Sequence, residues 1–287
     1  MNTTIIGESV IGYSHIIHGG VRQDNFCVVD GINEGSKKNH KYRQLPQGTR
    51  IIAVADGHGS TSCPYSNEGS KIATKVFCDL MADYAIKYKK NIKELFLMLS
   101  NEGENVRIAK RIVGEWEECI NSYHLHKGRE ILYDDNHGVD KEAIWKQYGT
   151  TLIGMLITPS FVFAFQLGDG DITHVSKEDV SPMIEGDKML GVETHSISKP
   201  DSWGKVITKV VSLENLSDTP FMYVLSTDGW LNSHTSVGEF HKTCKEYYDM
   251  IRDKGSEIVE NNLKSWLEET SKLGCGDDIT VVFVYFD

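Results

Sequence analysis

Short apolar segments rich in β-branched and aromatic residues recur along the chain, separated by polar turns. Most are bounded by Gly, Asp, Asn or Pro, as β-strands usually are. They predict strands at Asn25–Asp30, Arg50–Ala55, Thr151–Ile157, Phe161–Leu167, Asp171–Ser176, Lys205–Leu213, Met222–Ser226 and Ile279–Phe286.

Other segments repeat their apolar residues at helical spacing. In Ser66–Lys87 the apolar residues, from Ile72 to Ala85, recur every three or four positions and fall on one helical face. This pattern predicts a helix there. It also predicts helices at Ile92–Ser100, Asn105–Tyr123, Ser236–Arg252 and Ile258–Leu273, the last of them stopped by Gly274.

The order of these elements predicts the fold class. Strands that follow one another without an intervening helix pair antiparallel. We therefore expect an α+β protein, a four-layer α-β-β-α sandwich of two antiparallel β-sheets flanked by helices, with residues 1–287 forming a single domain. The polar segment Asp134–Asp140 is expected to be a surface loop, and Ser176–Trp203 the most mobile insertion.

Composition and charge exclude several classes of partner. The formal net charge of −11 argues against nucleic acid or an anionic membrane. No apolar run is long enough to span a bilayer, and the first residues lack the features of a secretory signal, so we expect a cytoplasmic protein. The six cysteines include no Cys-x-x-Cys pair and none has an arginine six positions later. A structural zinc site and a cysteine-dependent phosphatase are therefore not expected.

Acidic residues stand where predicted strands meet turns. Singly they have a simple explanation, because Asp-Gly pairs such as Asp56-Gly57 and Asp228-Gly229 are common in hairpin turns. Together they would repel one another once the strands become neighbours, and a cation would be needed to hold them. Oxygen ligands of this kind favour magnesium or manganese. The residues are Asp24, Asp56, Asp169, Asp228, Asp277 and Asp278.

The motifs around these aspartates resemble those of a known family. Val54–Ser60 is similar to the aspartate–glycine–histidine–glycine signature of the metal-dependent protein phosphatases, the type 2C family. The segment Gly7–Phe26 resembles the opening motif of its bacterial branch. Four later segments resemble further motifs of the family and follow one another in the family's order. They are Gly149–Thr151, Leu167–Asp169, Leu225–Gly229 and Gly276–Val281.

This resemblance implies a serine/threonine protein phosphatase that hydrolyses phosphoserine or phosphothreonine. The attacking group would be a hydroxide bridging two Mn²⁺ or Mg²⁺ ions. Asp56 would bridge both ions and the Gly57 carbonyl would complete one of them, while Asp228 and Asp277 would bind the other.

The resemblance also implies roles around this pair of ions. Asp24 would hold metal-bound waters in the outer shell, and Asp169 would help Asp228 to bind a third, weaker ion. His58 would be the general acid that protonates the leaving oxygen, since histidine can do so near neutral pH. The expected partners are a phosphorylated protein substrate and a cognate kinase, and the expected state is a monomer.

Two positions depart from the family pattern. Many members carry an arginine five residues before the opening aspartate to bind the substrate phosphate, and this chain has Gly19 there. Arg22 is the candidate replacement. Asp278 stands where asparagine is usual, and its extra negative charge would favour metal binding if it faces the site.

Two other functions are compatible with parts of the sequence. Asp169-Gly170-Asp171-Ile172-Thr173 fits the nucleophile motif of haloacid dehalogenase-like phosphatases, with Asp169 as nucleophile, although the surrounding strands lack crossover helices. A noncatalytic pseudophosphatase that binds phosphoproteins is the other alternative. A calcium loop beginning at Asp169 fails, because its sixth position is His174 rather than glycine.

Overall fold

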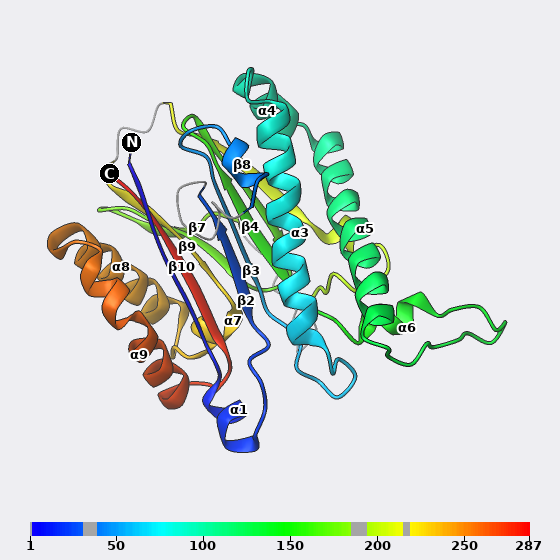
Figure 1. The fold of residues 1–287 in the computed structure, drawn as a ribbon. Coiled ribbons are helices and arrows are strands. Elements are labelled where there is room, and N and C mark those ends of the chain that lie inside the picture. The colour runs from blue at the N-terminus through cyan, green and yellow to red at the C-terminus, as the bar shows by residue number, and fades with distance from the viewer. Residues whose placement is uncertain (1, 31–38, 185–193, 215–218) are drawn as a thin grey trace.

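Two five-stranded antiparallel sheets face each other and carry helices on their outer faces (Figure 1). This computed structural model describes residues 2–30, 39–184, 194–214 and 219–287. The layers confirm the predicted α-β-β-α sandwich. The order in the first sheet is β1 (Thr3–Val10), β10 (Ile279–Phe286), β9 (Phe221–Ser226), β6 (Asp171–Val175) and β7 (Val180–Pro182). The order in the second is β2 (Asn25–Val29), β3 (Arg50–Ala55), β4 (Leu152–Ile157), β5 (Phe161–Leu167) and β8 (Ile207–Ser212).

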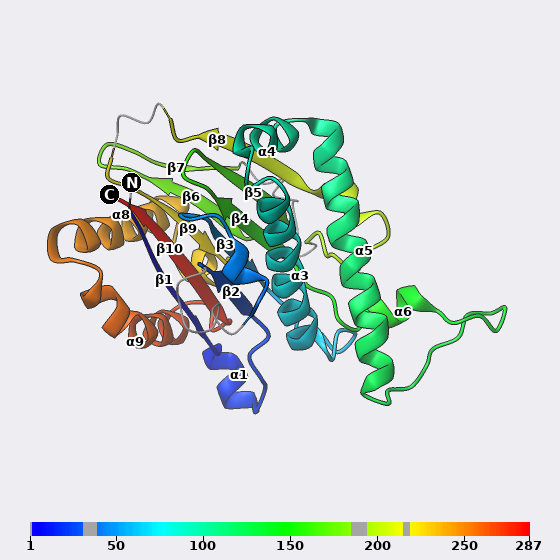
Figure 2. The same ribbon diagram turned by 45° about the horizontal axis from the view of Figure 1, so that its top comes forward.

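The helices form the two outer layers, which Figure 2 shows on opposite sides of the sheets. The second sheet is covered by α3 (Ser66–Lys87), against which α4 (Ile92–Leu99) and α5 (Glu102–His126) pack, with α6 (Lys141–Lys146) packed on α5. The first sheet is covered by α8 (Val237–Lys254) and α9 (Glu257–Leu273). Short helices α1 (Tyr13–His18) and α7 (Asp228–Asn232) lie at the ends of strands, and two 3₁₀ turns span Tyr42–Gln44 and Ser202–Lys205.

Apolar side chains fill the three spaces between the layers. Val54, Ile153 and Leu225 belong to the cluster between the two sheets, where strands are buried on both faces. Trp116 packs between the second sheet and its helices, and Trp230 does so on the other side. The strands of both sheets are therefore held in fixed positions at their ends, where the acidic residues lie.

Several elements differ from the sequence-based prediction. Strand β1, the short strand β7 and the helices α1, α6 and α7 were not predicted. Neither Asp-Gly pair forms a hairpin turn, because Asp56 leads from β3 towards α3 and Asp228 begins α7. Asp134–Asp140 is an exposed turn, as predicted. The expected mobile insertion, Ser176–Trp203, contains β7, and its residues 185–193 lie outside the described residues.

Candidate active site

Five aspartates from both sheets lie at one end of the sandwich. Asp24 precedes β2 and Asp56 follows β3, so the antiparallel pairing of these strands puts both at one edge. Asp169 follows β5, Asp228 follows β9, and Asp277 precedes β10. We call these five residues the acidic cluster. The predicted convergence of distant carboxylates is therefore present in the fold.

The charges of the acidic cluster act on one another. Burial raises the pKa of Asp56 well above its usual range, and the charges of Asp24, Asp228 and Asp277 raise it further. Burial and the charge of Asp278 raise the pKa of Asp24 to about 8. The pKa of Asp228 is raised to about 6, first by burial and then by the charge of Asp169.

Asp56 is the centre of this group. Its carboxyl group lies near those of Asp24 and Asp228, whose like charges raise its pKa. A divalent cation relieves the same repulsion with hard oxygen ligands. The donor set therefore fits a magnesium or manganese centre.

The Gly149–Thr151 motif fixes the backbone of Asp56. The amide of Thr151 and the hydroxyl of Thr150 donate to the Asp56 carbonyl at 2.9 and 2.7 Å. The amide of Asp56 donates to the Thr151 hydroxyl at 3.0 Å. These bonds hold Asp56 in register with β4, so this motif positions the central carboxylate.

Asp24 is held from the opposite sheet. Asp24 is 1% exposed, and its carboxyl group accepts a hydrogen bond of 2.7 Å from the hydroxyl of Thr227, which precedes α7. The same hydroxyl accepts the amide of Thr280 in β10 at 3.0 Å. One threonine therefore ties β2, β9 and β10 together at the acidic cluster. Sequence reasoning missed Thr227, although it lies inside the Leu225–Gly229 motif.

His58 lies beside the cluster, in a pocket of about 720 Å³ that also includes Ser198 and Lys199. Its amide donates to the carbonyl of Gly149 at 3.2 Å. Its ring packs so closely on Gly149 that a Cβ there would lie 2.7 Å from the ring. Burial lowers the pKa of His58, the charge of Asp169 opposes this, and Lys199 lowers it further.

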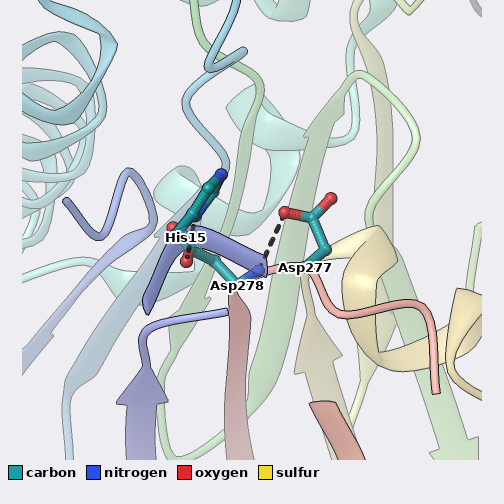
Figure 3. A group of neighbouring side chains, drawn as sticks. All are labelled: His15, Asp277 and Asp278. Carbon is teal, nitrogen blue, oxygen red and sulfur yellow. Dashed lines mark hydrogen bonds and ion pairs between the residues drawn. The ribbon is translucent and has the colours of Figure 1, made fainter. Parts of the chain in front are cut away.

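The carboxylate of Asp278 holds the N-terminal segment onto β10. It accepts the amides of Gly12 at 2.6 Å, Gln23 at 2.5 Å and Asp24 at 3.3 Å, and it bonds Nδ1 of His15 at 2.8 Å. We call this arrangement the Asp278 clamp. Figure 3 shows the His15 ring against this carboxylate. Asp278 is 3% exposed, so these bonds are shielded from water and hold the backbone on both sides of α1, up to Asp24, against β10.

His15 lies within the Gly7–Phe26 motif, which by itself indicates no role for it. Its ligand atom and those of Asp277 and Asp278 lie within 4.8 Å of one another. Asp56, Asp228 and Asp277 do not form so tight a group among the described residues. However, the Asp278 carboxylate is already engaged by amides, and Asp277 Oδ1 accepts the Asp278 amide at 2.8 Å. We therefore assign His15 to the clamp.

The two departures from the family pattern lie near the clamp. Gly19 ends α1 with φ of 71°, a left-handed conformation that favours glycine. Arg22 donates from its guanidinium to the Ser9 carbonyl at 2.7 Å. It lines a pocket to which none of the acidic cluster contributes. Its contact with the substrate phosphate stays a prediction.

The family model described as Protein phosphatase 2C matches residues 11–268. The chain belongs to this family. Consequently it is an enzyme of the phosphoprotein phosphatase class, with phosphoproteins as substrates. The antiparallel pairing of every described strand also removes the basis for the haloacid dehalogenase alternative, which needs parallel strands joined by crossover helices.

Solved structures share the type 2C fold. A serine/threonine phosphatase of S. agalactiae is 16% identical over 100% of both chains, with a TM-score of 0.55. The catalytic domain of PstP in complex with two manganese ions is 12% identical over 99% of both chains, with a TM-score of 0.55. PppA, a T6SS component of Pseudomonas aeruginosa, is 12% identical over 100% of this chain and 99% of its own, with a TM-score of 0.54. No curated protein matches the sequence significantly. Within the described residues, no helix of this type 2C protein is long and apolar enough to cross a membrane.

Proposed function

We propose that this chain is a metal-dependent protein serine/threonine phosphatase whose centre holds two divalent cations, Mn²⁺ or Mg²⁺. The observation that carries the proposal is the mutual effect of the carboxyl groups on Asp56, because such a group is stabilised by bound positive charge. Asp56, the Gly57 carbonyl, Asp228 and Asp277 would hold the two ions. Asp24 would orient their waters, and Asp169 would contribute with Asp228 to a third site.

The cations, when bound, supply positive charge to the phosphate and lower the pKa of the attacking water. The chain's own residues prepare the site for them. Thr150 and Thr151 fix the central carboxylate, and Thr227 fixes Asp24. The catalytic domain of PstP binds two manganese ions in its own structure, which supports manganese as the metal proposed here.

His58 is proposed as the general acid for the leaving serine or threonine oxygen. It stands at the boundary between the acidic cluster and the pocket with Ser198 and Lys199, which could receive the peptide chain of the substrate. Its pKa is lowered by burial, so protonation has to be supported by the negative charge of Asp169 and of the substrate phosphate. Arg22 remains a proposed phosphate contact.

The cellular setting is part of the proposal. We propose that the chain forms one catalytic domain that acts as a monomer in the cytoplasm on the products of a serine/threonine kinase. The free state of all six cysteines supports a reducing compartment. The charge of −11 supports a protein partner over nucleic acid or an anionic membrane.

The test is manganese-dependent hydrolysis of an aryl phosphate and of a phosphothreonine peptide by the purified chain. We expect turnover with Mn²⁺, none with EDTA, and none in Asp56→Asn, whose folding is checked by circular dichroism. Asp135→Asn, which changes an exposed turn residue by the same charge, should remain active. Absence of turnover by the manganese-loaded wild type would favour the noncatalytic alternative, and turnover by Asp56→Asn would contradict the proposed centre.

A further inference from the structure

A second pocket, of about 670 Å³, lies on the side of the sandwich, between the helical layers and over the edges of the two sheets. We call it the side pocket. Strands β1 and β2 lie side by side there, between α9 and α3 (Figure 1). The charged and amide side chains in its lining that could contact a ligand are those of Arg22, Lys71, Lys264, Asn25, Asn67 and Glu268. Its volume is in the range of pockets that bind small ligands or side chains.

The charge of the side pocket is opposite to that of the whole chain. Three cationic side chains line it, in a protein whose net charge is −11. Glu68 also lines it, but its carboxylate is engaged by Arg129 at 2.6 Å and by the hydroxyl of Tyr123 at 2.9 Å. Glu268 is the other acidic residue in the lining.

The cations of the side pocket are available to a ligand. Within the described ranges, no ion pair involves Lys71 or Lys264, and both are exposed. Arg22 is fixed in place by its 2.7 Å bond to the Ser9 carbonyl, which uses one of its five N–H donors. Asn67 adds an uncharged polar side chain to the lining, whereas the side-chain amide of Asn25 already donates to the Asn67 carbonyl at 3.0 Å and to the Ser70 hydroxyl at 2.8 Å. This set suits a phosphate or carboxylate group.

Residues of the side pocket are next in sequence to residues of the candidate active site on three segments. Asn25 follows Asp24, and Ile11 precedes Gly12, whose amide belongs to the Asp278 clamp. Asn67 follows Ser66, whose carbonyl lies so close to Gly57 that a Cβ on Gly57 would be 2.8 Å from it. The side pocket is therefore a neighbour of the acidic cluster, and a side chain a few positions away from the phosphorylated residue of a substrate can reach it.

We propose that the side pocket binds a second anionic side chain of the phosphoprotein substrate, either a phosphorylated residue or a glutamate or aspartate. The proposal rests on the proposed phosphatase activity. An acidic enzyme repels acidic substrates through its overall field, and a local cationic pocket next to the site reverses this for a correctly placed group. The side pocket would thus select substrates that carry more than one negative group.

The experiment compares two phosphothreonine peptides, one with neutral neighbours and one with a second phosphate or several glutamates. With wild type we expect KM for the acidic peptide to be lower, by about tenfold for two exposed charge contacts. Lys71→Glu/Lys264→Glu should remove this preference. It should hydrolyse an aryl phosphate like wild type, because that substrate is too small to reach the side pocket.

The matched control is Lys93→Glu/Lys254→Glu, which makes the same change of net charge at exposed positions outside the side pocket. This control should keep the preference for the acidic peptide. Its result distinguishes an effect of the side pocket from an effect of the net charge of the protein. Equal KM values in wild type, a preference that survives in Lys71→Glu/Lys264→Glu, or an equal loss in the control would each overturn the proposal. Saturable binding of inorganic sulfate at the side pocket, with no preference among peptides, would show that the pocket binds a free anion. This result would also overturn the proposal.

Failure of the proposed activity would be seen separately. If manganese-loaded wild type hydrolyses no aryl phosphate, binding of the two fluorescently labelled peptides by anisotropy still tests the side pocket. A tighter Kd for the acidic peptide that is lost in Lys71→Glu/Lys264→Glu supports the proposal. Equal Kd values refute it.

Discussion

Asp228→Asn probes the acidic cluster directly, because asparagine keeps the size of the side chain and removes its charge. One oxygen of Asp228 accepts the side-chain amide of Asn232 at 2.9 Å, and the asparagine oxygen can still accept it. Burial and the charge of Asp169 raise the pKa of Asp228 from 3.8 to about 6. An ionised carboxylate at this position therefore destabilises the metal-free protein.

The size of the effect follows from the shift. A pKa raised by about two units corresponds to about 3 kcal/mol at a pH above both values. Without metal at pH 7, Asp228→Asn should raise the free energy of unfolding by up to this amount. For a chain of this length the melting temperature should rise by about 5 °C. The stability gain of Asp228→Asn over wild type depends on pH, because only the ionised carboxylate is destabilising. This gain is absent below pH 3.8, grows as the pH rises towards 6, and is constant above pH 6.

Manganese should reverse this order of stability. A cation at 100 times its Kd stabilises the folded wild type by about 2.7 kcal/mol per site, and the variant lacks a ligand. The assay is thermal unfolding followed by circular dichroism, in EDTA and across a manganese titration, with Asp135→Asn as the control for charge. A variant that melts at or below wild type in EDTA, or that gains as much from manganese, would refute the reasoning.

Three further substitutions test other parts of the structure. His58→Ala should slow a phosphothreonine peptide by about 10²–10⁴-fold but an aryl phosphate much less, because the aryl leaving group needs little protonation; equal losses in steady-state assays would remove His58 from the acid role. Asp278→Ala should lower the free energy of unfolding in urea by about 2–4 kcal/mol, because buried amides lose their acceptor, and Asp278→Asn should lose less. Trp230→Ala should cost about 3–5 kcal/mol in the same assay, whereas exposed Tyr133→Ala should cost little; similar losses would contradict the burial of Trp230.

The long elements of the fold could be predicted from the sequence. Helix α3 has the predicted bounds, Ser66–Lys87, because a repeated apolar face records its packing against the second sheet. Strand β5 also has its predicted bounds, since it is buried throughout. Strand β1 was missed because it is an edge strand with polar residues at Thr3, Thr4 and Glu8.

Short helices could not be predicted for a different reason. Helix α7 has five residues, Asp228–Asn232, which is too few for a repeated pattern, and its first two residues also suit a turn. The buried Trp230 in it is held by tertiary contacts with α8 and β10. Such contacts are not visible in a local sequence window.

Individual residues of the candidate site show the same limit. The convergence of Asp24, Asp56 and Asp228 could be expected, because strand ends are predictable and like charges must be compensated. The hydrogen-bond partner of Asp278 could not be predicted from the sequence. Its carboxylate accepts the amide of Gly12, which lies 266 positions away in the chain. Asp278 thus has a structural role in the clamp that its sequence does not indicate, and its charge also raises the pKa of Asp24, so its effect on metal binding stays a prediction.

The place of β10 in its sheet has a consequence for biosynthesis. This strand lies between β1 and β9, and it pairs with β1 from Thr3↔Phe286 to Val10↔Ile279. A nascent chain that lacks Ile279–Phe286 leaves β1 without its neighbour in the sheet and removes the strand that fixes the position of Asp278. The first strand of the chain can therefore pair in its sheet only after the residues of β10 have been translated.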